Sequence, residues 1–191
     1  MAVKKKSDLD FNTLVEAIQR VDLYCSGQAR QAVNLSLTMR NWLIGAHIAE
    51  FELHGQDRAT YGEKLLSELA KRLTTHGVSS SDRRQLYRYL RFYRLFPSIV
   101  GTLSPQLKGL FPVCKVASKK VGTLSPLLEF PPEILVQKLS YSHLEQLVDL
   151  EFDLQRTFYT VECIHGGWSV REVQRQISSL YYERPGLPEQ F

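Results

Sequence analysis

The segment 82–96, DRRQLYRYLRFYRLF, constrains the fold most, because its apolar and basic residues separate at the period of a helix. At 3.6 residues per turn, one side of that helix carries Leu86, Tyr89, Leu90, Tyr93 and Phe96. The other side carries Arg84, Arg88 and Arg91, with Tyr87 and Arg94 along its edge. The pattern predicts a helix that packs through an aromatic stripe and presents guanidinium groups to phosphates or to another acidic surface.

A second short amphipathic helix is predicted just before it, over residues 62–73 (GEKLLSELAKRL), with a polar turn over 74–80. A helix, a short turn and a basic helix are typical of a helix-turn-helix, whose second helix enters the major groove. We therefore expect a helix-turn-helix-like unit over about 60–96. The candidate nucleic-acid-binding residues are Lys71, Arg72, Arg83, Arg84, Tyr87, Arg88, Arg91 and Arg94.

Helical spacing also dominates the rest of the chain. Asp10 is positioned to cap a first helix that the Ser26-Gly27 pair should break, and a long second helix is expected over about 28–53. Three capping boxes are predicted, at Asp82 with Gln85, Ser142 with Glu145 and Ser169 with Glu172. No segment alternates apolar and polar residues as a strand does, so the predicted fold class is all-α.

The composition changes between residues 97 and 138. Six of the eight prolines lie between 97 and 132, and the hexapeptide VGTLSP occurs twice, at 100–105 and 121–126. We interpret this range as an irregular connector that was lengthened by a local duplication. The expected organisation is a basic flexible tail (1–9), a helical lobe (10–96), the connector (97–138), a C-terminal helical hairpin (139–184) and a tail (185–191).

The last predicted helix carries a narrow apolar seam, formed by Val170, Val173, Ile177 and Leu180. Spacings of three and four residues are those of a coiled-coil contact. The seam is interpreted either as packing within the chain or as a homodimer interface.

Charge and hydropathy narrow the class of protein. A net charge of +4 favours a polyanionic partner mildly, and 43% hydrophobic with 23% charged residues is ordinary for a globular protein. No apolar run approaches the roughly 18 residues of a membrane span. Asp8 and Asp10 follow the basic N-terminus where a signal peptide needs apolar residues, so we expect a cytoplasmic protein without membrane contact.

The sequence contains no recognisable catalytic pattern. A restriction-type nuclease needs an acidic residue with lysine two positions on, and no acidic residue here has one. The three cysteines and five histidines are widely spaced, so we expect no metal, no cofactor and no enzyme activity. The alternative that stays open is a site assembled from distant carboxylates such as Glu50, Glu52 and Asp57.

Several landmarks occur in the order seen in the YhcG-type N-terminal domain, an all-helical module of bacterial proteins. The resembling segments are 41–45 (NWLIG), 61–66 (YGEKLL), the arginine helix to Phe96-Pro97, 139–143 (LSYSH) and 167–172 (GWSVRE) with Arg175-Gln176-Ile177. The resemblance implies a helix-turn-helix-like module that usually precedes a PD-(D/E)XK nuclease domain, and this sequence looks as if it stops where that domain would begin. The chain departs from the family at Tyr141, where tryptophan is usual, and in the longer connector.

The sequence thus supports a non-catalytic module that binds nucleic acid, with double-stranded DNA as the expected partner. In one alternative the arginines form a solvated face, some of them paired with Glu63 or Glu68. In another, Tyr87 stacks on unpaired bases of a single strand. A different class of function is a protein–protein module that dimerises, or that docks onto a nuclease or a restriction–modification partner.

Overall fold

The computed structural model describes residues 10–55, 64–110 and 131–183, and all regular elements within these ranges are helical. They are α1 (Phe11–His54), α3 (Leu65–Thr75), α4 (Arg83–Leu95), η2 (Pro97–Thr102), α5 (Pro105–Lys108), α6 (Pro132–Lys138), α7 (Tyr141–Asp149), α8 (Asp153–Gly166), α9 (Val170–Ser178) and η3 (Tyr181–Glu183). The predicted all-α class is confirmed. None of the described helices combines the length and the hydropathy that crossing a membrane requires. The predicted tails, 1–9 and 185–191, lie outside the described residues.

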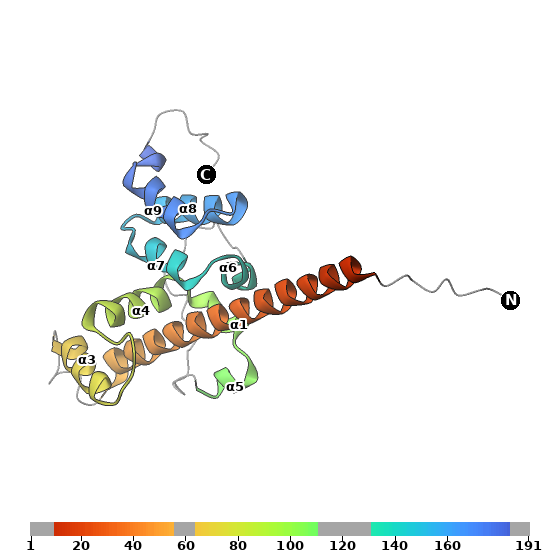
Figure 1. Cartoon of the computed structure of the whole chain (residues 1–191). Coiled ribbons are helices and arrows are strands. Elements are labelled where there is room, and N and C mark those ends of the chain that lie inside the picture. Colours follow the sequence, from red (N-terminus) through yellow and green to blue (C-terminus); the bar gives the residue numbers. More distant parts are fainter. Residues whose placement is uncertain (1–9, 56–63, 111–130, 184–191) are drawn as a thin grey trace. The chain divides into compact units, whose positions relative to one another are not determined.

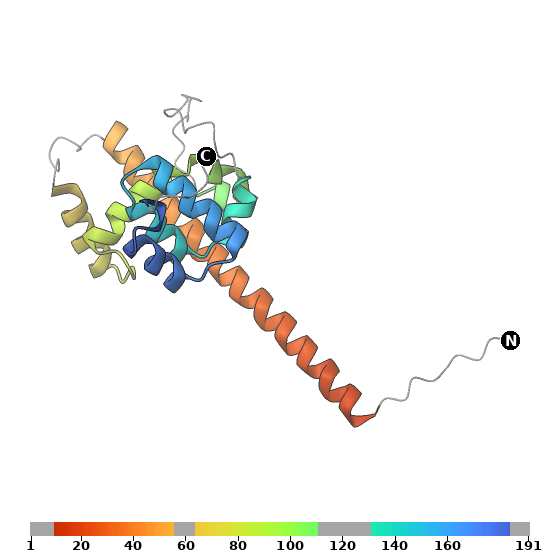
Figure 2. The same cartoon turned by 90° about the horizontal axis from the view of Figure 1, so that it is seen from above.

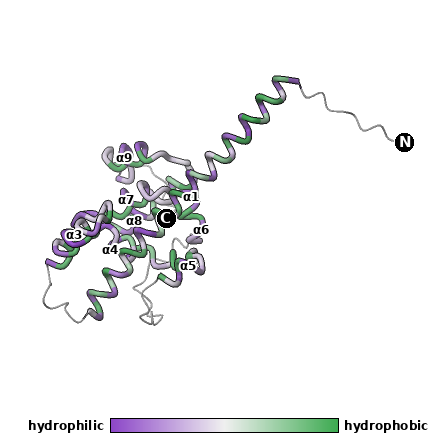
Figure 3. Tube along the Cα trace, turned by 60° about the horizontal axis from the view of Figure 1, so that its bottom comes forward, coloured by the Kyte–Doolittle hydropathy of each residue, from purple (hydrophilic) through white to green (hydrophobic). Residues whose placement is uncertain are grey.

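The first helix begins as predicted and then continues where a break was expected. The amide of Thr13 donates to Asp10 Oδ1 at 2.7 Å, which caps α1. The predicted break at Ser26-Gly27 is wrong, because α1 is one helix of 44 residues. A glycine costs a helix only about 1 kcal/mol relative to alanine, and no proline follows Gly27 to remove a hydrogen bond. Hydrophobic positions recur along α1 (Figure 3).

The chain divides into two units, residues 1–34 and residues 35–191. Within the second unit, α4 packs against α1, α3 and α7 (Figures 1 and 2). The approach to α1 is close enough that a Cβ added to Gly45 would lie 2.0 Å from the carbonyl oxygen of Tyr89. On the α7 side, the rings of Phe92 and Tyr141 are 5.9 Å apart. The predicted apolar stripe of this helix is packed, since Leu86, Tyr89 and Leu90 are buried.

The main core of the second unit is built around Trp42. This side chain is fully buried, and its Nε1 donates to the carbonyl oxygen of Phe96 at 3.0 Å. It belongs to one core cluster with buried residues of η2, α6, α7, α8 and α9, which include Ile99, Leu135, Leu147, Tyr159 and Val173. The 41–45 and Phe96-Pro97 segments of the family resemblance thus meet in the core.

The described ends of the predicted connector are short helices rather than irregular chain. Its first hexapeptide copy, 100–105, ends η2 and begins α5. Leu103 is buried in the core, and Ser104 Oγ accepts from the amide of Leu107 at 3.3 Å as the cap of α5. The second copy, 121–126, lies outside the described residues.

Two of the three predicted capping boxes are those of α7 and α9. The box at Ser169 and Glu172 is confirmed, with both reciprocal hydrogen bonds present. The box at Ser142 is wrong, because α7 begins two residues earlier and Ser140 is its cap. His143 Nδ1 accepts from the Ser140 amide at 3.1 Å and so acts in place of the usual Glu or Gln.

Candidate nucleic-acid interface

The turn between α3 and α4 is built from residues 76–82 and fixed by local hydrogen bonds. Gly77 and Ser80 have positive φ angles of 72° and 53°, which reverse the chain direction. Ser81 Oγ donates to the carbonyl oxygen of Val78 at 2.7 Å, and the hydroxyl of Tyr89 donates to that of Ser80 at 2.9 Å. Tyr89 of α4 therefore holds the turn that precedes this helix in place.

Asp82 is the cap of α4, as predicted, and accepts from the amides of Arg84 and Gln85 at 2.9 and 3.1 Å. The reciprocal half of the predicted capping box is absent. The Gln85 side chain instead donates to Glu145 Oε1 on α7 at 3.0 Å. The Gln85 side chain therefore bonds to another helix and not to the backbone amide of Asp82.

Arg88 joins α4 to α7. Its Nε donates to Asp149 Oδ1 at 3.0 Å and its Nη1 donates to Glu145 Oε1 at 2.7 Å, while its Nη2 contacts the second oxygen of Asp149. The hydrogen bond to Asp149 raises the pKa of the Arg88 guanidinium. Since only 13% of the side chain is exposed, Arg88 serves the packing of α4 on α7.

Two further arginines of α4 are also engaged within the chain. Arg91 Nη2 donates to the carbonyl oxygen of Leu150 at 3.2 Å, and its guanidinium carbon lies 6.0 Å from the centre of the Tyr87 ring. Arg94 Nη2 pairs with Glu52 Oε2 on α1 at 2.5 Å. On α3, Arg72 pairs with Glu68 at 3.0 Å. Glu63, the other acidic partner considered for the arginines, lies outside the described residues.

Three candidate cations are left for a ligand. Lys71, Arg83 and Arg84 are exposed, and their side chains form no hydrogen bond or ion pair with the residues that the structure describes. They lie in the last turns of α3 and the first turn of α4, at the two ends of the short connection. Tyr87, one turn further along α4, is half exposed. We call Lys71, Arg83, Arg84 and Tyr87 the basic end.

The α9 seam is mostly directed into its own chain. Val173 is fully buried, and Ile177 packs against the same core. Val170 is partly buried, and Leu180 is exposed. The within-chain interpretation therefore accounts for the two central residues of the seam.

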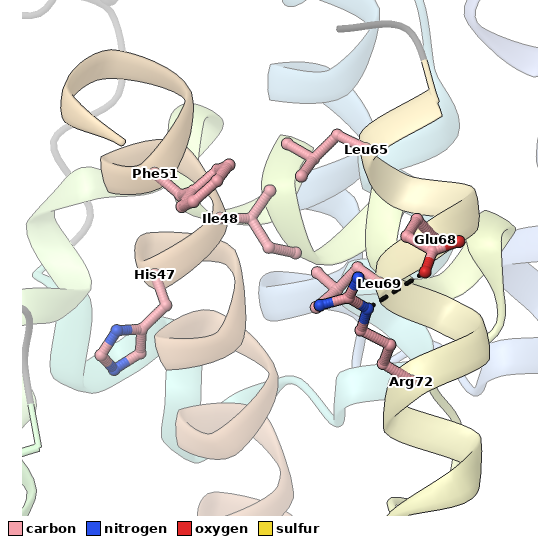
Figure 4. Close-up of a pocket in the computed structure, with 7 residues that line it drawn as sticks. All are labelled: His47, Ile48, Phe51, Leu65, Glu68, Leu69 and Arg72. Carbon is pink, nitrogen blue, oxygen red and sulfur yellow. Dashed lines mark hydrogen bonds and ion pairs between the residues drawn. The ribbon is translucent and has the colours of Figure 1, made fainter. Parts of the chain in front are cut away.

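A cavity of about 370 Å³ lies between α1 and α3. Ile48 and Phe51 of α1 face Leu65 and Leu69 of α3 across it, with the ion pair of Glu68 and Arg72 at one side (Figure 4). Sequence patterns give no sign of this cavity, since each residue by itself belongs to an ordinary amphipathic helix. Most of its surface is apolar, and its polar lining residues are His47, Glu68 and Arg72.

The structure also shows two polar contacts that sequence reasoning missed. His143 Nε2 lies 3.0 Å from the carbonyl oxygen of Trp168 and ties the start of α7 to the start of α9. Arg156 is buried, and its guanidinium donates to the carbonyl oxygens of Leu147 and Leu150 at 3.2 and 2.6 Å. Neither pairing has a local sequence signal. Among the described residues, no three His, Cys, Asp or Glu side chains gather as metal ligands.

Comparison with known proteins gives two matches. The profile of the DUF1016 N-terminal domain matches residues 17–120 and 128–184. A protein of Escherichia coli (strain K12) named "Putative nuclease YhcG" is 31% identical over 160 residues, which cover 81% of this chain and 41% of that protein. The chain therefore spans less than half the length of this relative. No solved structure matches the chain significantly.

Proposed function

The chain belongs to the family of the DUF1016 N-terminal domain, and from that premise we propose that it binds double-stranded DNA without cutting it. The observation that carries the proposal is the basic end. Lys71, Arg83 and Arg84 are cations without an acidic partner among the described residues, whereas Arg72, Arg88 and Arg94 are paired. Unpaired surface guanidinium and ammonium groups are the usual ligands of phosphate.

The N-terminal part of α4, rather than its whole basic stripe, is the part that contacts the DNA in this proposal. A recognition helix contacts base edges mainly with its N-terminal residues, while phosphate contacts fix its orientation. Arg83, Arg84 and Tyr87 occupy that N-terminal part. Arg88 and Arg94, which pair with acidic residues of α7 and α1, contribute stability to the unit rather than affinity for DNA.

The test is a salt titration of a fluorescently labelled duplex. Each phosphate that a cation neutralises contributes a slope of about −0.9 to the plot of log K against log salt. Three contacts therefore predict that replacing Lys71, Arg83 and Arg84 together by alanine makes the slope shallower by about 2 to 3. The matched control replaces Lys108, Lys138 and Arg171, which are exposed cations elsewhere on the surface. It removes the same charge and should leave the slope almost unchanged.

Absence of duplex binding at low salt, or equal slopes for the two triple variants, would contradict the proposal. Single-stranded DNA is the informative competitor. The guanidinium of Arg91 lies over the Tyr87 ring, which supports duplex over stacked single-strand binding. A clear preference for the single strand would overturn that part.

The non-cleaving part of the proposal rests on the missing acidic-x-lysine element and on the share of the nuclease-named relative that the chain spans. Of the distant carboxylates, Glu52 pairs with Arg94, Glu50 lies near His54, and Asp57 lies outside the described residues. We expect plasmid DNA to stay intact with Mg²⁺ or Mn²⁺. Nicking that co-purifies with the protein and is lost in Glu50→Ala would refute this.

A protein–protein module is the second candidate function. It is favoured by the exposed apolar residues of α1, of which Phe11 is 78% and Val21 64% exposed.

A further inference from the structure

The part of α1 over residues 11–34, which we call the arm, has almost no covered side chain. Apolar residues that normally lie inside a protein are open to water there; Ile18 and Val21, for example, are 60% and 64% exposed. Tertiary packing of an apolar face, rather than helix propensity, supplies most of a helix's stability. The arm contains several poor helix formers, such as Gly27 and Val33. Its helical state therefore calls for a partner surface.

The arm carries a coiled-coil seam. Its positions recur at alternating spacings of three and four, and they are Phe11, Leu14, Ile18, Val21, Cys25, Gln28 and Ala32. Hydrophobic positions can be followed along the arm in Figure 3. Beyond the arm the same heptad positions are held by Leu35 and then by Met39, Trp42, Ala46 and Ala49, of which the last four are buried. The same heptad positions therefore already form a packing face in the second half of α1, where other helices cover them.

The one polar side-chain amide of the seam, that of Gln28, favours a second copy of the same arm that runs parallel to the first. In two parallel copies in register, each Gln28 lies opposite its own counterpart, so one side-chain amide can hydrogen-bond the other. A single polar residue at a core position is a known means of fixing register and direction in coiled coils. An antiparallel pair that overlaps along the whole arm would instead place Gln28 against Ile18 and leave both amides buried without partners.

Charge also permits this pairing. The positions that flank the seam are Val15, Ala17, Asp22, Tyr24, Ala29 and Gln31, with a single charged residue. In a parallel coiled coil these positions of one helix face those of the other, and like charges there are repulsive. Asp22 would face Ala17 of the second copy rather than another acid. No electrostatic repulsion at these positions opposes self-association.

We propose that the arms of two copies of this chain associate in parallel and in register through the seam from Phe11 to Ala32. This contact is separate from the α9 seam, whose central residue Val173 is buried in its own chain. It does not depend on the binding of DNA by the basic end, so the two proposals can fail separately.

Light scattering of the full chain without DNA, from low to high micromolar concentration, tests the association. The chain mass is 22.0 kDa, so the measured mass should rise two-fold to 44.0 kDa. Ile18→Asp should return it to one chain at every concentration. Leu23→Asp is the matched control, because Leu23 is 69% exposed on the same helix but lies opposite the seam. Its mass should equal that of the unsubstituted chain.

Cys25 reports the direction of the two arms. In a parallel pair in register, the two copies of Cys25 meet, and oxidation with copper–phenanthroline should cross-link them in a Cys114→Ser background. In an antiparallel pair that overlaps along the whole arm, Cys25 faces Val21. At 1.5 Å per residue the two Cys25 residues then lie about 6 Å apart along the axis, in addition to the separation of the two helices. Their Cα atoms are therefore farther apart than the roughly 7 Å that a disulfide spans.

Cys25→Ser should abolish the cross-link, because Cys163 is buried in its own chain. A chain that stays monomeric, a dimer insensitive to Ile18→Asp, or a dimer without the Cys25 cross-link would overturn the proposal.

Discussion

Arg88 of α4 and Asp149 of α7 are joined at two points, with the guanidinium Nε donating to Oδ1 at 3.0 Å. Glu145, one turn earlier on α7, accepts a third hydrogen bond from the same guanidinium. An arginine engaged in this way has few donors left for a phosphate. The contact therefore separates Arg88, which holds two helices together, from the exposed Arg83 and Arg84 of the same helix.

Arg88→Ala should lower the free energy of unfolding by about 1–3 kcal/mol, because it leaves Glu145 without its charged partner near the surface of α7. Urea denaturation followed by circular dichroism measures the change. Arg83→Ala removes an equally charged but exposed side chain and should stay within about 0.5 kcal/mol of the unsubstituted protein. Equal losses for the two variants would contradict the assignment of Arg88 to packing.

His143 should make the protein less stable in mild acid. Because the Ser140 amide donates to Nδ1, that nitrogen is unprotonated, and Nε2–H donates to the Trp168 carbonyl oxygen. Burial lowers the pKa of His143 below its ordinary value of 6.5. The unfolded chain then binds the proton more readily, so stability is complete above about pH 6.5 and is lost as pH falls through the lower folded-state pKa.

Urea midpoints between pH 8 and pH 5 measure this loss. The matched variant is His143→Gln, whose side chain does not titrate. It should be less stable at neutral pH and should show a smaller fall between pH 7 and pH 5. A variant with the same pH dependence as the unsubstituted protein would show that another group titrates instead.

Gly45→Ala should destabilise the second unit strongly. The new Cβ would lie 2.0 Å from the carbonyl oxygen of Tyr89, which is backbone and cannot rotate away, so α1 and α4 must move apart. Overpacking of this kind costs about 1–3 kcal/mol or more. Gly27→Ala is the control, since nothing lies within 4 Å of its added Cβ. Thermal denaturation should give a lower midpoint for the first variant and no decrease for the second.

Separate substitutions of Ser140 and Ser142 test which of the two serines caps α7. Ser140→Ala removes the side-chain acceptor of the capping box and should cost about 0.5–2 kcal/mol. Ser142→Ala changes an exposed residue within the helix and should be neutral or slightly stabilising. Chemical denaturation of both variants compares them. A larger loss at Ser142 would mean that α7 begins where the sequence pattern placed it.

The sequence predicted the features that depend on residues within one or two helical turns of each other. The helical period identified α4, and the Ser-x-x-Glu spacing located the start of α9, because both signals act within one turn. The break at Gly27 was a wrong inference from local propensity, which costs too little to end a long helix. The cap of α7 was misplaced because a histidine fills the position expected of Glu or Gln.

The roles of the arginines could not be predicted in the same way. Arg88 finds its acceptors 57 and 61 residues away, and Arg94 pairs with a glutamate 42 residues before it. A helical projection assigns side chains to faces, but it does not say which face another helix will cover. The basic stripe of α4 was therefore visible in the sequence, whereas its division into arginines paired within the chain and arginines left unpaired was not.

The duplicated hexapeptide makes the length of this part of the chain open to change by recombination. Leu103 and Ser104, which supply a core side chain and a helix cap, belong to the repeated sequence itself. Recombination between the copies at 100–105 and 121–126 would delete 21 residues and leave one intact VGTLSP. The shortened chain would keep both of these residues in the same order after η2. A deletion between the two copies would thus preserve the core leucine and the capping serine. We expect natural variants of different length to differ mainly between residues 100 and 126.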